Sequence, residues 1–222
     1  MRRGWTLILG MLLLGLLPWR GAAAAPASAP AVKPQVLLVI GDSLSAGYGL
    51  ETGSGWVALL HKRLQDKSLP WRVVNASISG ETTAGGMQRL PALLQRDHPG
   101  LVVIELGGND ALRGLSLAAT QSNLRSMVSA CQHFGARVLL VGMRIPPNYG
   151  PAYTRGFDEL FARVARLQHV PLVPFLLADV VDHPDWFQSD NIHPTAAAQP
   201  TMLDTVWPVL EPLLRNASGR RR

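Results

Sequence analysis

The sequence predicts an α/β domain, a three-layer α/β/α sandwich around a central parallel sheet of about five strands. Short apolar runs of strand length alternate with longer segments whose apolar residues recur at helical spacing. The short runs are apolar throughout, which is typical of strands that are buried on both faces. Alternating strands and helices form right-handed βαβ units, and a chain of 222 residues suits one such domain.

The strand and helix candidates follow one another along the chain in a regular order. The five strand candidates are residues 35–40, 71–74, 101–106, 137–141 and the weaker 172–175. The helix candidates are residues 55–65, 86–96, 117–134, 153–168 and 195–215. Pro200 and Pro208 interrupt the last helix, because proline lacks the N–H group that a helix interior uses. One domain over residues 35–215 therefore contains all the predicted elements.

The N-terminal residues 1–24 have the three parts of a secretory signal peptide. Two arginines precede an apolar run at residues 7–17, and small residues lead to a cleavage site that we place after Ala24. A membrane anchor is the alternative, but the uncharged stretch 4–19 is shorter than the ~20 residues of a spanning helix. We therefore expect a mature protein that is periplasmic or secreted and has no stable membrane anchor.

The rest of the composition excludes several classes of protein. Residues 25–34 are predicted to be a linker and residues 216–222 a basic, disordered tail. Six arginines at the two ends of the chain match the formal net charge of +6, so we expect no nucleic-acid partner. One cysteine, Cys131, excludes a disulfide framework and a Cys-based metal site. No group of possible ligands has the spacing of a metal site. We expect no cofactor, and we expect the protein to be a monomer.

Polar and glycine-containing turns follow the first three strands, where the chemistry of a parallel sheet gathers. The first turn is Gly41-Asp42-Ser43-Leu44-Ser45, which places a serine hydroxyl at the start of a helix. Gly80 follows the second strand, and Gly107-Gly108-Asn109-Asp110 follows the third. Backbone N–H groups and an Asn amide there could bind an anion. Taken singly, each turn is more typical of an ordinary helix cap or tight turn.

A late loop carries the sequence Asp190-Asn191-Ile192-His193-Pro194. The carboxylate of Asp190 can accept a hydrogen bond from one ring nitrogen of His193 while the other ring nitrogen faces outward. This arrangement fixes the tautomer and lets the imidazole act as a general base. Asp182 and His183 are the nearest alternative, but adjacent residues reach this geometry less easily. The pattern therefore indicates His193 among the six histidines.

Together the four segments resemble the SGNH hydrolases, also called GDSL lipases and esterases. The matching segments are Gly41-Asp42-Ser43-Leu44, Gly80, Gly107-Gly108-Asn109-Asp110 and Asp190 with His193. The resemblance extends over residues 36–212 and is strongest to the bacterial periplasmic thioesterase I and lysophospholipase branch. It implies a flavodoxin-like fold and a serine esterase that hydrolyses acyl esters and thioesters, with lysophospholipids and aryl esters among its substrates.

The resemblance also implies a role for each matched residue. Ser43 would be the nucleophile, His193 the general base and then acid, and Asp190 the residue that orients His193. The N–H groups of Ser43 and Gly80 and the side-chain amide of Asn109 would form the oxyanion hole. These roles are chemically consistent, because a serine hydroxyl needs a base to attack and preorganised donors stabilise the charge that develops.

Two loops, after the third and the fourth strand, should border the nucleophile and bind the substrate. Their side chains are mostly apolar, which suits an acyl chain better than a sugar, although such loops also occur as ordinary packing. The candidate substrate-binding residues are Leu112, Arg113, Gly114, Leu115, Ile145 and Pro146. The resemblance implies that the loop around Gly114 could move over a bound acyl group.

The sequence leaves two other functions open. A carbohydrate O-acetylesterase would belong to the same superfamily and would strictly prefer acetate. A non-catalytic α/β binding module could keep the fold, and it would not react with a fluorophosphonate probe. A nucleotide-binding protein is not predicted, because neither Gly-x-Gly-x-x-Gly nor a Walker A sequence follows the first strand.

Overall fold

The computed structural model describes Met1 and residues 34–215. The predicted signal peptide after Met1, the linker up to residue 33 and the tail 216–222 lie outside the described residues. Five parallel strands form one sheet, in the order β2-β1-β3-β4-β5. The strands are β1 (Gln35–Gly41), β2 (Trp71–Asn75), β3 (Leu101–Glu105), β4 (Arg137–Val141) and β5 (Leu172–Val173). The predicted five-stranded parallel sheet is confirmed.

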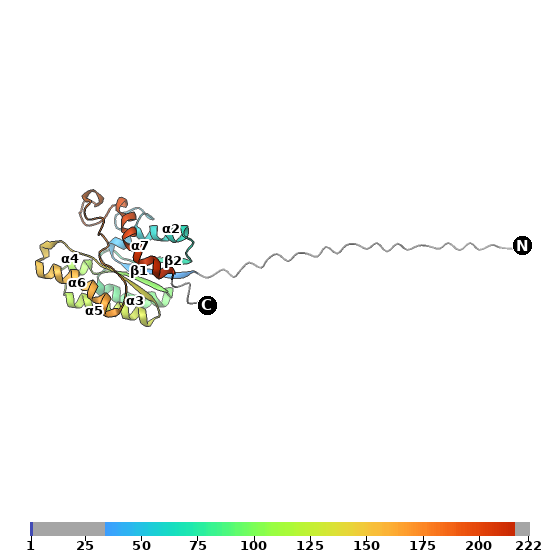
Figure 1. The fold of residues 1–222 in the computed structure, drawn as a ribbon, viewed down its shortest axis with the longest axis horizontal. Helices are drawn as coiled ribbons and strands as arrows, with labels where there is room; N and C mark the ends of the chain where they lie inside the picture. Colours follow the sequence, from blue (N-terminus) through green and yellow to red (C-terminus); the bar gives the residue numbers. More distant parts are fainter. Residues whose placement is uncertain (2–33, 216–222) are drawn as a thin grey trace. The chain divides into compact units, whose positions relative to one another are not determined.

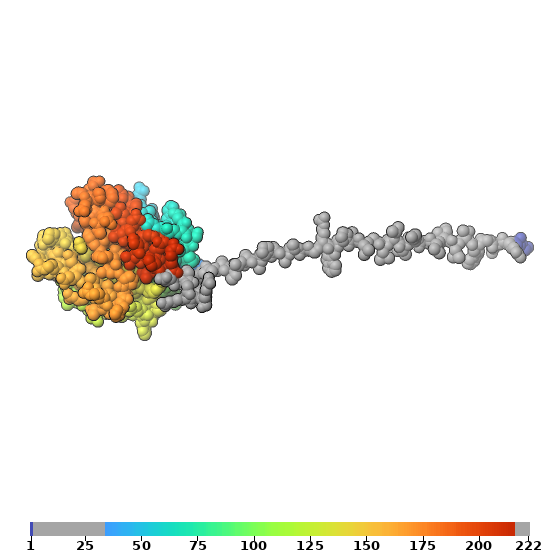
Figure 2. Space-filling model, viewed as in Figure 1, coloured from blue at the N-terminus to red at the C-terminus, as the bar shows by residue number. Residues whose placement is uncertain are grey.

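Helices cover both faces of this sheet, so the predicted three layers are also confirmed (Figure 1). One face packs against α3 (Thr83–Asp97), α5 (Leu117–His133) and α6 (Pro151–Gln168). The other face packs against α2 (Trp56–Asp66) and α7 (Gln199–Arg215). The space-filling view shows α7, coloured red, on the surface that faces the viewer (Figure 2).

The order of the strands reverses around β1, and this reversal places the functional turns together. The chain passes from β1 to β2 on one side and then crosses to β3 on the other side of β1. In the register of the sheet, Gly41 at the end of β1 lies beside Glu105 at the end of β3. Chain segments that leave neighbouring strands at such a reversal diverge, and the space between them is where ligands bind in open α/β sheets.

A single apolar core lies between the sheet and the two helix layers. Leu37, Leu38, Val39 and Ile40 of β1 are all fully buried, as expected for a strand that is covered on both faces. Each such side chain contributes about 1.5–3 kcal/mol when it leaves water. Cys131 of α5 is buried in the same core, and burial raises the pKa of its thiol to about 12. Cys131 therefore serves as a packing side chain of the core.

Several element boundaries differ from the prediction for identifiable reasons. α3 begins at Thr83, earlier than predicted, because the Thr82 side chain accepts a hydrogen bond from the N–H of Gly85 at 3.3 Å and caps the helix. β5 ends before Pro174, because proline has no N–H to donate to a neighbouring strand. Pro200 does not break α7, since it lies in the first turn, where a helix tolerates proline.

Candidate active site

Ser43 is the first residue of the short helix α1 (Ser43–Ala46) and lies two residues beyond the end of β1. Asp42 caps this helix, and its carboxylate accepts a hydrogen bond from the N–H of Leu44 at 3.1 Å. The Asp42 side chain is buried, whereas Ser43 is half-buried. The cap therefore holds the backbone on both sides of Ser43 while the serine itself remains accessible.

Asp190 and His193 lie in a loop whose ends are held together by backbone hydrogen bonds. The loop runs between the two short 3-10 helices η2 (Pro184–Trp186) and η3 (Ala196–Ala198). Phe187 and Pro194 form an isolated antiparallel bridge, and the N–H of Gln188 donates to the carbonyl of His193 at 2.8 Å. Because both ends are fixed, the loop has a defined shape although it has no regular secondary structure.

The carboxylate of Asp190 is fixed by the loop itself. Its Oδ1 accepts hydrogen bonds from the N–H groups of Ile192 and His193 at 2.9 Å and 3.0 Å, and its Oδ2 lies 2.7 Å from Nδ1 of His193. The backbone N–H of His193, then its ring, then the N–H of Ile192 lower the pKa of Asp190 to about 2. The carboxylate is therefore ionised at neutral pH and faces the imidazole.

The structure brings the three predicted side chains into one hydrogen-bonded series. Nε2 of His193 lies 2.9 Å from Oγ of Ser43, although the two residues are 150 positions apart in the chain. When Nδ1 holds its proton toward Asp190, Nε2 presents a lone pair to the serine hydroxyl. Such an arrangement can remove a proton from the hydroxyl as it attacks an electrophilic carbon.

Two further residues, which the sequence did not indicate, connect the serine turn to the histidine loop. The ring of Tyr48 packs beside the ring of His193, with 4.4 Å between the centroids. The side-chain amide of Gln188 donates to the carbonyl of Tyr48 at 2.9 Å. Tyr48 follows Ser43 by five residues, but nothing in a single sequence shows that its ring packs against an imidazole from the other end of the chain.

Asn109, the amide predicted for the oxyanion hole, is tied to the serine turn. It is the second residue of α4 (Gly108–Leu112), the short helix that follows β3. Its Nδ2 donates to Oδ2 of Asp42 at 3.0 Å. An amide nitrogen carries two hydrogens, so this bond orients the group and leaves the second hydrogen available to another acceptor.

Gly80 lies in the loop between β2 and α3, and this loop packs against the same turn. The N–H of Ile78 donates to the carbonyl of Gly41 at 3.0 Å. Gly80 has a φ of +79°, a conformation that residues with a side chain rarely adopt. The guanidinium of Arg113 donates to the carbonyl of Gly80 at 2.8 Å, so the loop after Asn109 also contacts the Gly80 loop.

The six predicted substrate-binding residues separate into two groups. Ile145 is buried in the core and presents little surface to a ligand. The other five are exposed, namely Leu112, Arg113, Gly114, Leu115 and Pro146. Tyrosine hydroxyls hold the first loop from beneath: Tyr149 donates to the carbonyl of Leu112 at 3.2 Å, and Tyr153 donates to that of Leu115 at 2.7 Å.

Large apolar side chains are exposed on each of the loops that carry the predicted catalytic and oxyanion residues. They form what we call the apolar rim, which consists of Tyr48, Ile78, Leu112, Leu115 and Ile192, each between 37% and 51% exposed. The sequence indicated only two of these residues, Leu112 and Leu115. Isolated apolar residues in loops have no periodicity that would separate an exposed side chain from a packed one.

Two buried carboxyl groups lie beneath the serine turn. Burial raises the pKa of Asp42 to about 6, although hydrogen bonds from Leu44 and Asn109 and the charge of His193 act in the opposite direction. Glu105, at the end of β3, is completely buried, and burial together with the charge of Asp42 holds the pKa of Glu105 well above its usual range. A buried pair of this kind favours a state in which at least one carboxyl is neutral.

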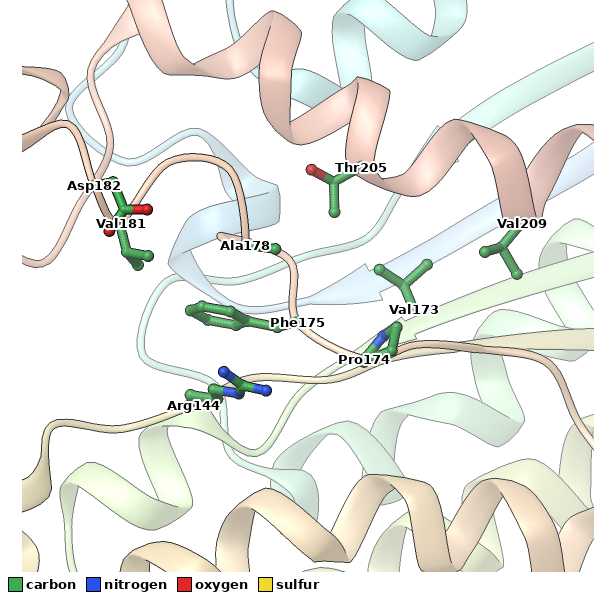
Figure 3. A pocket seen from close by; sticks show the side chains of 9 residues that line it. All are labelled: Arg144, Val173, Pro174, Phe175, Ala178, Val181, Asp182, Thr205 and Val209. Carbon is green, nitrogen blue, oxygen red and sulfur yellow. The ribbon is translucent and has the colours of Figure 1, made fainter.

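A separate hollow of about 410 Å³ lies near the ends of β4 and β5, against α7 (Figure 3). Apolar side chains make up most of its wall, together with Arg144 and Asp182. Its lining does not include Ser43, Asp190 or His193.

In the described part of the chain, no cluster of three or more His, Cys, Asp and Glu side chains could hold a metal ion. No helix within residues 34–215 is long and apolar enough to span a membrane.

A parallel α/β sheet with a serine, a histidine and an aspartate hydrogen-bonded at the ends of its strands is characteristic of a serine hydrolase. The family model described as the GDSL-like lipase/acylhydrolase family matches residues 39–199. The chain belongs to this family, and it is an enzyme that hydrolyses ester bonds. The predicted family, fold and enzyme class are therefore confirmed.

Relatives with assigned names match almost the whole chain. The protein named esterase TesA from Pseudomonas aeruginosa is 52% identical, over 94% of this chain and 98% of its own length. The Escherichia coli K12 protein named thioesterase 1/protease 1/lysophospholipase L1 is 41% identical, over 95% of each chain. A crystal structure titled as TesA superposes with a TM-score of 0.79 at 55% identity and covers 81% of this chain and 99% of that one.

Proposed function

We propose that the protein is a serine esterase that hydrolyses acyl esters and thioesters, including lysophospholipids and aryl esters, through an acyl-enzyme intermediate on Ser43. The observation that carries this proposal is the series of contacts from Ser43 Oγ to His193 Nε2 at 2.9 Å and from His193 Nδ1 to Asp190 Oδ2 at 2.7 Å. A serine hydroxyl is a weak nucleophile unless an adjacent base takes its proton. This arrangement supports a reaction in two steps.

In the first step, Ser43 Oγ attacks the acyl carbon while His193 Nε2 takes the hydroxyl proton. Asp190 stabilises the imidazolium that forms and does not itself take the proton. The low pKa of Asp190, about 2, supports this role, because the carboxylate remains charged at the pH where the imidazole is neutral. The proton on His193 then passes to the departing alcohol or thiol, and the acyl group remains on Ser43.

The negative charge of the tetrahedral intermediate would be held by three donors: the N–H of Ser43, the N–H of Gly80 and the free hydrogen of the Asn109 amide. The bond from Asn109 to Asp42 supports this assignment, since it orients the amide before the substrate arrives. Donors that are fixed in advance stabilise the charge without reorganisation, and one such donor is typically worth about 3–4 kcal/mol.

In the second step, a water molecule attacks the acyl-enzyme while His193 Nε2 takes a proton from the water. The second tetrahedral intermediate collapses, the carboxylic acid leaves, and the proton on His193 returns to Oγ of Ser43. The same base therefore serves both steps, and no cofactor enters the balance of atoms and electrons.

The apolar rim supports an acyl substrate in preference to an acetylated sugar. Its five exposed side chains offer a surface for a hydrocarbon chain, and burial of apolar surface is worth about 25 cal/mol per Å². Acetate would cover little of it, and a sugar would need more polar partners. The names of the two relatives support the same substrate class. One is named an esterase, and the name of the other includes thioesterase and lysophospholipase.

A panel of substrates with matched acyl groups tests the proposal. The panel contains an oxyester, a thioester and a lysophospholipid, together with p-nitrophenyl esters of increasing chain length from acetate upward. We expect hydrolysis of all three classes, activity that extends beyond acetate, and a loss of at least ~10³-fold in Ser43→Ala. Strict preference for acetate would favour a carbohydrate O-acetylesterase, and an active Ser43→Ala variant would exclude the proposed mechanism.

The role of the rim has its own test. Leu112→Ser and Leu115→Ser should weaken kcat/KM for long acyl chains several-fold more than for acetate, since each loses apolar contact worth about 1–2 kcal/mol. Leu167→Ser on α6 is the matched control, because Leu167 is similarly exposed, at 53%, and lies outside the rim. An equal loss for acetate and for long chains would contradict an acyl-binding role for these two residues.

We further propose that residues 1–24 are removed as a signal peptide, that residues 35–215 form the catalytic domain, and that the mature enzyme is a periplasmic or secreted monomer. The order of charged, apolar and small residues at the N-terminus supports export. N-terminal sequencing of the exported protein should begin at Ala25, and sedimentation should give the mass of one chain. An intact Met1 end on a membrane-bound product would contradict this proposal.

A further inference from the structure

A buried carboxyl group accepts hydrogen bonds from the backbone just before Ser43 and from a side chain just after it. Glu105 is the last residue of β3 and is completely buried. Its Oε2 accepts a hydrogen bond from the hydroxyl of Ser45 at 2.7 Å and a longer one from the N–H of Asp42 at 3.4 Å. One of these donors precedes Ser43 by one residue, and the other follows it by two. One acceptor atom, Oε2 of Glu105, therefore bonds to the turn on both sides of the serine.

The lack of a side chain at residue 41 makes room for this carboxyl. Gly41 lies beside Glu105 in the register of the sheet. A Cβ atom at residue 41 would lie 2.7 Å from Oε2 of Glu105 and 2.7 Å from Cβ of Ser45, which is closer than real contacts allow. The glycine of the serine turn is thus explained by the space that the Glu105 carboxyl and the Ser45 side chain occupy.

We infer that Glu105 is a positioning residue, whose carboxyl holds the turn 41–45 so that Oγ of Ser43 faces His193 and the N–H of Ser43 faces the substrate. This inference rests on the proposed function, because it assigns to Glu105 an effect on the reaction of Ser43. Glu105 touches neither the substrate nor the reacting atoms. It acts through Ser45 and Asp42, and an error of about 1 Å in the position of a nucleophile can cost about 100-fold in rate.

The surroundings of Glu105 favour the neutral acid. Its Oε1 is buried and has no hydrogen-bond partner, and the charged group that faces it is another carboxyl, that of Asp42. An ionised Glu105 would be a buried charge compensated only by the hydrogen bonds from Ser45 and Asp42, which is more costly than a buried neutral acid. A neutral carboxyl still offers an acceptor to Ser45 and Asp42, so the contact with the turn needs no charge on Glu105.

Two substitutions at this position separate the acceptor from the charge. Glu105→Gln keeps a neutral side chain of the same shape with a carbonyl acceptor, and we expect kcat to stay within about 3-fold of the wild type. Glu105→Leu keeps the approximate size but has no acceptor, and we expect kcat to fall by about 100-fold while KM changes less than about 3-fold. The acyl-binding surface is untouched in both variants, so a change confined to kcat reports the position of Ser43.

Control variants distinguish positioning from a general loss of stability. Val103→Ala removes buried side-chain atoms from the same face of the same strand, two residues earlier, without touching the turn. Its kcat should match the wild type at temperatures where thermal melts show it folded. Ser45→Ala removes one donor to Glu105 and should lower kcat by about 10-fold, but it should add little to Glu105→Leu, because both changes break the same contact.

Several results would overturn the inference. A folded Glu105→Leu or a Ser45→Ala variant with wild-type kcat would show that the contact does not position Ser43. A Glu105→Gln variant as impaired as Glu105→Leu would show that the acceptor alone is insufficient. If Glu105→Leu does not fold, Ser45→Ala and Glu105→Gln still test whether the contact with Glu105 positions Ser43. An active Ser43→Ala variant would refute the proposed function itself, whereas an inactive one leaves Glu105 to be judged by its own variants.

Discussion

The side-chain amide of Asn109 donates one hydrogen bond within the protein, and its second hydrogen remains available to a ligand. Nδ2 donates to Asp42 at 3.0 Å, and the remaining hydrogen is the one that we assign to the oxyanion. Asp42 also caps the helix of Ser43 through the N–H of Leu44 at 3.1 Å. A single buried carboxylate therefore orients both the proposed nucleophile and a proposed oxyanion donor, and changes at either residue should appear in turnover.

Replacing Asn109 by alanine should lower kcat by about 10²–10³-fold and change KM little. The charge that the amide binds exists mainly in the transition state, so ground-state binding of the ester should survive the change. Steady-state kinetics on a p-nitrophenyl ester measures both constants. Asn123→Ala is the matched control, because the Asn123 amide donates to Thr83 at 3.1 Å and makes no contact with the serine turn. A raised KM with unchanged kcat would contradict the oxyanion role.

The titration of Asp42 should make the protein less stable as the pH rises from about 4 to 6. Its pKa is about 6 in the folded protein, because of burial, and about 3.9 in an unfolded chain, so between these values the folded state holds more protons. The contribution of Asp42 to the unfolding free energy then decreases with increasing pH, in total by about 3 kcal/mol, and is constant above about pH 6. Asp42→Asn lacks this titration, so the wild type should lose stability relative to Asp42→Asn over this interval.

Urea unfolding of both proteins at several pH values between 4 and 7 measures this difference. A difference in unfolding free energy that is independent of pH would contradict the raised pKa of Asp42. A difference that changes in the opposite direction would mean that Asp42 is more acidic in the folded protein than in the unfolded chain.

The sequence indicates some of these residues and not others, for a physical reason. Ser43, Asn109 and His193 stand in short motifs whose chemistry can be recognised from residue type and order. Glu105 is the end of an apolar strand, and its contact with the serine turn depends on its lying beside Gly41 in the sheet. Register between strands is a property of the folded chain, so the role of Glu105 emerges only from the structure.

At the scale of elements, long apolar patterns were predictable and short turns were not. The strands β1 to β4 lie within one residue of the predicted ranges, because each buried strand is a continuous apolar run. The helix α4, which carries Asn109, has only five residues and is too short to show a helical period. Helix starts were displaced where a side-chain cap, such as that of Thr82, begins the helix before its apolar face begins.

Gln199 joins two helices from opposite ends of the chain, and its loss should destabilise both. It is buried at the start of α7, accepts a hydrogen bond from the N–H of Trp56 at 3.0 Å and donates to the carbonyl of Thr195 at 3.2 Å. Gln199→Leu leaves the N–H of Trp56 unpaired and removes one of the two hydrogen bonds to the carbonyl of Thr195, the other being from the N–H of Ala198. The change should lower the unfolding free energy by about 1–3 kcal/mol. Urea denaturation measures the change.

The control for Gln199→Leu is Gln88→Leu, which alters an exposed glutamine of α3 and should change stability by no more than about 0.5 kcal/mol. Equal stability of Gln199→Leu and the wild type would mean that α2 and α7 do not depend on this side chain. Thr195 follows His193 by two residues, so a destabilised start of α7 should also reduce esterase activity at temperatures well below the melting transition.

At the scale of the whole molecule, strand order rather than sequence distance determines which residues meet. β1 lies between β2 and β3, so the turns after these strands converge, and the loop 187–194 adds His193 to them. Alternating strands and helices made this fold predictable, because few parallel topologies satisfy right-handed crossovers. The detailed course of the loops was not predictable, and Ile145, expected at the substrate, is instead part of the core.

Covalent labelling with a fluorophosphonate, followed by mass spectrometry of the resulting peptides, shows directly whether Ser43 is the nucleophile. We expect one adduct per chain, on Ser43, with no labelling of Ser43→Ala and much slower labelling of His193→Ala. Stoichiometric labelling of Ser43→Ala, or an adduct on a different residue of the wild-type enzyme, would mean that Ser43 is not the nucleophile.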